Sequence, residues 1–179
     1  TYILCSNEEG LVIVDQHAAQ ERYHYEQLNE KLLVQCTNKQ PLMVPIQLDV
    51  SSNVLAQYMT INEKTAFFGI EFEPFGTDQL ILREIPLWFH DVDQKQFLQD
   101  LLDYFVENQD VDMAKLRKHM IATMACHSSI RFNRPLSMQE MEQVILDLQK
   151  CKQPYHCPHG RPTVIVMSDG ELRKEFERG

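Results

Sequence analysis

The sequence predicts an α+β protein with two lobes. Strand-like runs stand near both ends of the chain, and helical patterns alternate with further strands between them. A polar stretch without periodicity, 36–39, separates the first helical pattern from the strands that follow. We therefore expect one lobe built from both chain ends, residues 1–39 and 151–179, with a second lobe, residues 40–150, inserted into it.

The chain opens with a strand pair followed by a helix. Residues 1–5 and 11–14 are strand-like, and the polar segment 6–10 between them ends in glycine, as a hairpin turn would. Asp15 is suited to cap the helix that we predict over 16–34.

The middle of the chain contains a strand, a hairpin and four helices. The strand covers 41–50, where apolar residues alternate with others, and the hairpin joins 70–75 to 79–85. Ser137 with Glu140 three residues later forms a capping box. The helices are predicted at 51–68, ending at Gly69, at 94–107, at 113–128, and from Ser137 to about Lys150.

The last segment changes character again. Three prolines and a glycine make 154–162 a loop. The β-branched run 163–167 predicts a strand, which we expect to join the N-terminal strands, and 171–177 predicts a short charged helix.

Composition narrows the class of protein. The 179 residues have a formal net charge of −9, which argues against strong binding of nucleic acid by this chain alone. Five cysteines without framework spacing indicate a reducing compartment, with free or metal-bound thiols. No apolar run reaches membrane-spanning length, so no membrane contact is expected. The chain begins inside a strand without Met, and we expect it to be part of a longer protein.

Two potential metal ligands lie on the first helix. His17 and Glu21 are four residues apart, so an imidazole and a carboxylate share one helix face. Glu26 lies roughly 140° away from Glu21 around the helix and is placed to pair with Arg22. A capped helix with a solvated polar face would show the same pattern.

A second ligand cluster lies in the C-terminal loop. Cys157 and His159 are two residues apart in extended chain, so their side chains point the same way. Arg161 is suited to orient a carboxylate or a phosphate. Cys126 adds a fifth candidate ligand, although a buried helix cysteine is the simpler interpretation. Mixed His, Cys and carboxylate donors suit Zn²⁺, or a site with more than one divalent ion.

Two motifs resemble one protein family closely. Asp15-Gln16-His17-Ala18, followed by Glu21 and Glu26, and Cys157-Pro-His-Gly-Arg-Pro162 are both complete. They resemble the C-terminal endonuclease and dimerisation domain of the DNA mismatch repair protein MutL. A third family motif, Ala-Cys-Arg, is only partial, because His127 follows Ala125 and Cys126 where the family has a basic residue.

The resemblance implies a homodimer whose first lobe pairs the subunits and whose inserted lobe is regulatory. It implies nicking of one DNA strand in mismatch repair, stimulated by Mn²⁺, with Zn²⁺ held by the same residues and ATP bound only by a separate N-terminal domain. A mismatch-recognition protein would act through the full-length protein, in the cytoplasm of a bacterium and in association with the nucleoid. The implied catalytic residues are Asp15, His17, Glu21 and Glu26, and the implied metal ligands are His17, Glu21, Cys126, Cys157 and His159.

The segment Gln40-Pro41-Leu42-Met43-Val44-Pro45 resembles the motif by which this family contacts the replication sliding clamp. Gln40, Leu42, Val44 and Pro45 are its candidate contact residues, since an extended apolar segment can enter a cleft on a partner. A plain first strand of the inserted lobe is the alternative interpretation.

Two other functions fit these residues. One is a dimerisation and clamp-docking module in which zinc is only structural. The other is a zinc hydrolase of small molecules, which requires a deep pocket at the ligands.

Overall fold

The computed structural model describes residues 2–89, 92–127 and 134–178, without the side chain of Cys126. Its mixed helices and small antiparallel sheets confirm the predicted α+β class. The chain divides into two compact units, Thr1–Gln27 with Arg131–Gly179, and Leu28–Ile130.

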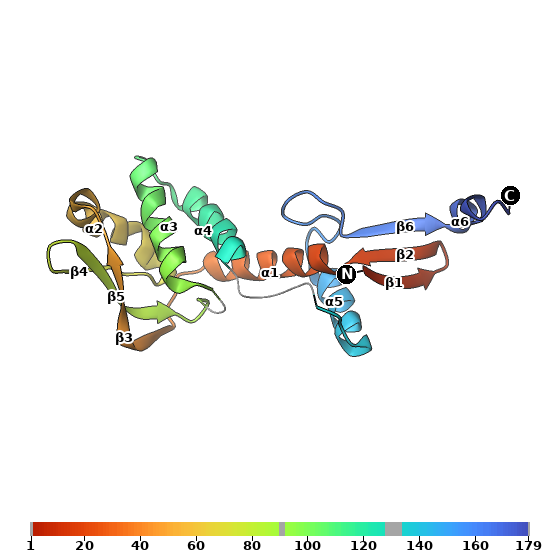
Figure 1. The fold of residues 1–179 in the computed structure, drawn as a ribbon, viewed down its shortest axis with the longest axis horizontal. Helices are drawn as coiled ribbons and strands as arrows, with labels where there is room; N and C mark the ends of the chain where they lie inside the picture. The colour runs from red at the N-terminus through yellow and green to blue at the C-terminus, as the bar shows by residue number, and fades with distance from the viewer. Residues whose placement is uncertain (1, 90–91, 128–133, 179) are drawn as a thin grey trace. The chain divides into compact units, whose positions relative to one another are not determined.

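The first unit contains a three-stranded antiparallel sheet in the order β1-β2-β6 (Figure 1). Its strands are β1 (Tyr2–Asn7), β2 (Gly10–Asp15) and β6 (Val164–Ser168), so the C-terminal strand joins the N-terminal pair as predicted. Gly10 has a φ of +139°, and a Cβ there would lie 2.2 Å from the carbonyl oxygen of Met167. Only glycine therefore allows β2 to begin so close to β6.

Two helices complete the core of the first unit. Helix α1 (Gln16–Leu32) begins directly after β2, and its residues up to Gln27 belong to this unit. Helix α5 (Met138–Lys150) begins at the predicted capping box of Ser137 and Glu140. The buried cluster is formed by Ile3, Val14, Ala19, Val144, Leu148 and Cys151.

The positions of α1 and α5 differ from the expected lobe boundaries. We expected 40–150 to form the inserted lobe, but Val144 and Leu148 of α5 share a core with Ile3 of β1. Conversely, residues 28–39 lie in the second unit. The reason is physical: the apolar face of α5 needs a partner layer, and the sheet of the first unit provides it.

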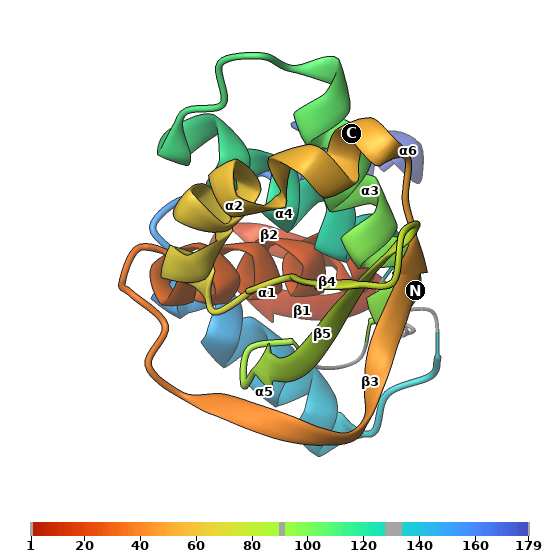
Figure 2. The same ribbon diagram turned by 90° about the vertical axis from the view of Figure 1, so that its left-hand side faces the viewer.

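The second unit is built on a sheet in the order β3-β5-β4 (Figure 2), with β3 at Lys39–Asp49, β4 at Glu73–Phe75 and β5 at Gln79–Pro86. Helices α2 (Ser52–Thr65) and α3 (Gln94–Glu107) contact this sheet, and α4 (Met113–His127) packs on α3. A 3₁₀ turn, Ala66–Phe68, ends at Gly69, whose φ of +88° makes it the predicted glycine cap. The expected helix end at 128 lies outside the described residues.

An aromatic cluster fills the centre of the second unit. The ring centroids of Phe89 and Phe97 lie 5.0 Å apart, and the indole nitrogen of Trp88 donates to the carbonyl of Phe68 at 2.8 Å.

In the described parts of the chain, every helix is too short or too polar to serve as a membrane span.

Candidate metal centre

The junction between β2 and α1 fixes the first part of the site. Asp15 Oδ1 accepts a hydrogen bond from the amide of Ala18 at 3.0 Å, which confirms Asp15 as the cap of the helix. The amide of Asp15 donates to the carbonyl of Thr163 at 2.9 Å. The start of α1 is thereby tied to the residue that precedes β6.

His17 and Glu21 share one face of α1, as their spacing predicts. His17 Nε2 lies 2.8 Å from Glu21 Oε1. The Glu21 side chain retains 17% of its accessible surface, so the pair lies partly inside the unit. The imidazole thus helps to fix the orientation of the carboxylate.

The C-terminal ligands lie in a loop, residues 151–163, that we call the C-x-H loop. The amide of Cys157 donates to the carbonyl of Arg161 at 2.8 Å, and the amide of Gly160 donates to the carbonyl of Cys157 at 2.9 Å. Gly160 has a φ of +82°, which suits glycine in this tight turn. The loop therefore has a defined hairpin shape, with Cys157 buried and His159 exposed.

Residues from the two ends of the chain meet at one point. One ligand atom each from Glu21, Cys157 and His159 lies within 4.8 Å of the other two. Glu21 Oε2 lies 3.4 Å from His159 Nδ1 and is buried without a hydrogen bond among the described residues. A carboxylate, a thiol and an imidazole are ligands that Zn²⁺ accepts, and a cation would satisfy the buried oxygen.

The other predicted site residues are not among these three convergent ligands. His17 contacts Glu21 but is not one of the three convergent ligands. Arg161 is exposed at the end of the turn. Cys126 belongs to α4, but its side chain lies outside the part that the structure describes. The neighbouring His127 Nε2 pairs with Asp100 Oδ2 in the second unit.

Glu26 and Arg22 contact more than each other. Their predicted ion pair has a closest distance of 3.8 Å. Glu26 also accepts hydrogen bonds from the amides of Lys152 and Gln153, and Arg22 donates to the carbonyl of His156. The sequence predicted neither contact with the C-x-H loop, because the partners are backbone groups that carry no residue signature.

Gln16 was named only as part of a motif, and the sequence predicted no contact for its side chain. Its side chain is buried, and the side-chain Nε2 donates to the backbone carbonyl of Arg134 at 3.0 Å. It ties α1 to the segment that leads into α5. The place of Gln16 in the motif Asp15-Gln16-His17-Ala18 was a signal in the sequence, but it did not say which backbone group the side chain contacts.

The proposed clamp segment lies in β3 of the second unit. The pairing of β3 with β5 shifts between Pro41 and Ile46, so that the residues between them bulge from the ladder. Met43 is fully exposed and Val44 is 77% exposed, whereas Leu42 is half-buried. The segment thus presents apolar side chains on a strand without continuous pairing.

Comparison with known proteins identifies the family. A family model described as the MutL C terminal dimerisation domain matches residues 1–136. The chain belongs to the MutL C-terminal dimerisation domain family. The relatives named "DNA mismatch repair protein MutL" from Anoxybacillus flavithermus and Shouchella clausii are 39% and 36% identical to it over 178 residues, or 99% of the chain.

These alignments extend through the C-x-H loop, beyond the end of the family match. A third MutL relative, from Lactococcus lactis, is 34% identical over 181 residues. This MutL C-terminal domain spans 27% to 29% of the length of these relatives.

Proposed function

We propose that this domain nicks duplex DNA during mismatch repair, as a homodimer loaded with divalent cations. The observation that carries the proposal is the convergence of Glu21, Cys157 and His159 from opposite ends of the chain. The relatives are named as mismatch repair proteins, which supplies the process.

The chain's own residues would hold the ions and the substrate. Glu21, Cys157 and His159 are the proposed ligands, with His17 orienting the Glu21 carboxylate. A bound divalent cation supplies Lewis-acid stabilisation of the charge that develops on a phosphoryl oxygen. Asp15 lies at the start of α1, where its carboxylate would assist metal binding or accept a proton from water. Arg161 would orient a phosphate, because an exposed guanidinium can bind two of its oxygens.

Homodimerisation would use the open face of the β1-β2-β6 sheet. Leu4, Ile13 and Ile165 lie opposite one another across the three strands, on the face that Ile3 and Val14 do not occupy. Leu4 is 65% exposed and Ile165 is 50% exposed. An apolar row of this kind is typical of a buried interface, and the family is one of dimerisation domains.

Clamp docking would use the bulge in β3. Pro41 and Pro45 lack amide donors, and Met43 and Val44 are already exposed, so the bulged residues 42–45 can enter an apolar cleft without first leaving the ladder with β5. The net charge of −9 fits a domain that a clamp delivers to DNA, since an acidic domain by itself binds DNA weakly.

The test is nicking of supercoiled plasmid by the full-length protein with Mn²⁺. Asp15→Asn and Glu21→Lys should abolish nicking and leave the dimer intact, whereas Glu8→Gln in the exposed β1-β2 turn should have no effect. Undiminished nicking by both site variants would refute the assignment.

A dimerisation and clamp-docking module with structural zinc is the second candidate function. The burial of Cys157, at 1% exposure, favours it, because structural zinc sites are closed. It predicts that chelation unfolds the first unit and that no metal supports nicking. A zinc hydrolase of small molecules would need a deep pocket at the ligands. Two cavities among the described residues, of about 200 and 460 Å³, have other linings.

A further inference from the structure

Arg22 holds the C-x-H loop from the side of α1. Its side chain is buried, with 7% exposure, and its Nε donates to the carbonyl of His156 at 2.6 Å. The ring of Tyr25 lies 5.5 Å from the guanidinium carbon. His156 immediately precedes Cys157, so this hydrogen bond acts on the backbone next to a proposed ligand.

Glu26 holds the start of the same loop. Its Oε2 accepts from the amide of Lys152 at 2.7 Å, and its Oε1 accepts from the amide of Gln153 at 3.0 Å. Its Oε1 also lies 3.8 Å from Arg22 Nη1, so the carboxylate compensates the buried positive charge. Two side chains one turn apart on α1 therefore bind two successive parts of the loop.

These contacts differ in kind from those inside the loop. The hydrogen bonds from the Cys157 amide to the Arg161 carbonyl and from the Gly160 amide to the Cys157 carbonyl set the shape of the turn, but they do not determine where the turn lies relative to α1. That placement decides whether Cys157 and His159 reach Glu21, which precedes Arg22 on the helix. If the loop were held less firmly, ion binding would have to order it at a cost in conformational entropy.

We propose that Arg22 and Glu26 are positioning residues that fix the C-x-H loop against α1 and thereby set the affinity of the centre for a divalent cation. The inference rests on the proposed metal centre. Neither side chain needs to touch the ion, because the outer partners of metal ligands act by orienting them.

The experiment measures binding of Zn²⁺ by chelator competition, and of Co²⁺ by its thiolate charge-transfer absorption. The samples are the wild-type full-length protein and its variants Arg22→Met and Glu26→Gln, with Lys31→Met as the control. Lys31→Met removes a positive charge from an exposed position on the same helix. Thermal unfolding of the metal-free proteins reports whether each variant folds.

We expect Arg22→Met to weaken Zn²⁺ binding by about 10- to 100-fold, the range typical of lost outer partners. Its Co²⁺–thiolate absorption should reach saturation only at correspondingly higher Co²⁺. Glu26→Gln keeps one acceptor for the loop amides and should weaken binding less, and Lys31→Met should bind as wild type. If Arg22→Met does not fold, Glu26→Gln carries the same test.

Wild-type affinity and absorption in the folded variants would overturn the positioning role while leaving the metal centre in place. Absence of a thiolate band in the wild-type protein would instead refute the metal centre itself. The two failures are therefore distinguishable without any measurement of nicking.

Discussion

Glu21 Oε2 lies 3.4 Å from His159 Nδ1, so a carboxylate on α1 faces an imidazole from the loop before β6. Glu21 lies on the helix that follows β2, and His159 lies in the loop that precedes β6. Pairing of β2 with β6 brings them together, because it places both ends of the chain on one sheet.

Replacing Glu21 by Gln should sharply reduce metal binding. The substitution removes the charged ligand that lies between the imidazoles of His17 and His159. The affinity for Zn²⁺ should therefore fall further than the ~10–100-fold that is typical when a hydrogen-bond partner of a metal ligand is lost. In the wild type, Zn²⁺ at 100 times its dissociation constant should stabilise the fold by about 2.7 kcal/mol, and chelation should remove this gain. Chelator competition and thermal unfolding measure both effects. A Glu21→Gln protein with unchanged affinity would exclude this ligand.

A charge on the open sheet face should separate the subunits. Leu4→Glu should weaken the dimer by about 100-fold or more, since an unpaired buried charge costs on the order of 3–5 kcal/mol. Met59→Glu, at an exposed apolar position of α2 in the second unit, is the matched control. Sedimentation velocity over a concentration series gives the dissociation constants. Equal dimerisation of the two variants would show that the subunits pair elsewhere.

Truncation of Leu148 should reveal that α5 belongs to the first unit. Leu148 is 5% exposed in the core with Ile3 and Val14, so Leu148→Ala should lower the free energy of unfolding by about 2–5 kcal/mol. Leu146, on the same helix, is 51% exposed, and Leu146→Ala should change the free energy of unfolding by less than about 0.5 kcal/mol. Urea denaturation compares the pair. Similar small effects would contradict the packing of α5 on the sheet.

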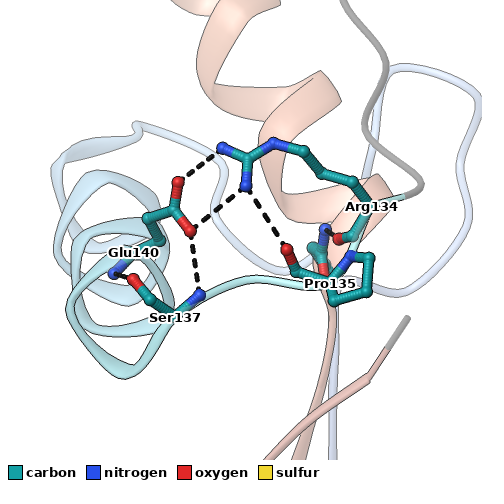
Figure 3. A network of polar contacts seen from close by, with 5 residues as sticks. Arg134, Pro135, Ser137 and Glu140 are labelled. Atoms are coloured by element: carbon teal, nitrogen blue, oxygen red, sulfur yellow. Dashed lines mark hydrogen bonds and ion pairs between the residues drawn. The ribbon is translucent and has the colours of Figure 1, made fainter.

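The start of α5 should depend on acid in a defined range. Hydrogen bonds, first from Arg134 and then from the amide of Ser137, lower the pKa of Glu140 from 4.5 to about 2 (Figure 3). Because the pKa is lowered by folding, the stabilisation is complete above pH 4.5 and is lost as the pH falls towards 2. Relative to Glu140→Gln, the wild type should therefore lose stability across this range.

Carboxyl NMR titration of the folded protein measures the pKa of Glu140 directly. The control Glu142→Gln, at an exposed position of α5, should keep the acid dependence of the wild type. Titration of Glu140 near 4.5 in the folded protein would show that the contact with Arg134 does not persist in solution.

The amino-acid sequence by itself determined the local structure and the candidate chemistry. Caps at Asp15 and Ser137 and the glycine at 69 were readable, because each solves a local hydrogen-bonding or dihedral problem. The pairing of His17 with Glu21 followed from helical spacing alone.

The tertiary structure alone decided which distant segments meet. It placed α5 in the core of the first unit, because an amphipathic helix does not record in its sequence which sheet it will cover. It also brought Arg22 and Glu26 to the backbone of the C-x-H loop. Backbone amides and carbonyls are the same at every residue, so such contacts appear only once the chain has folded.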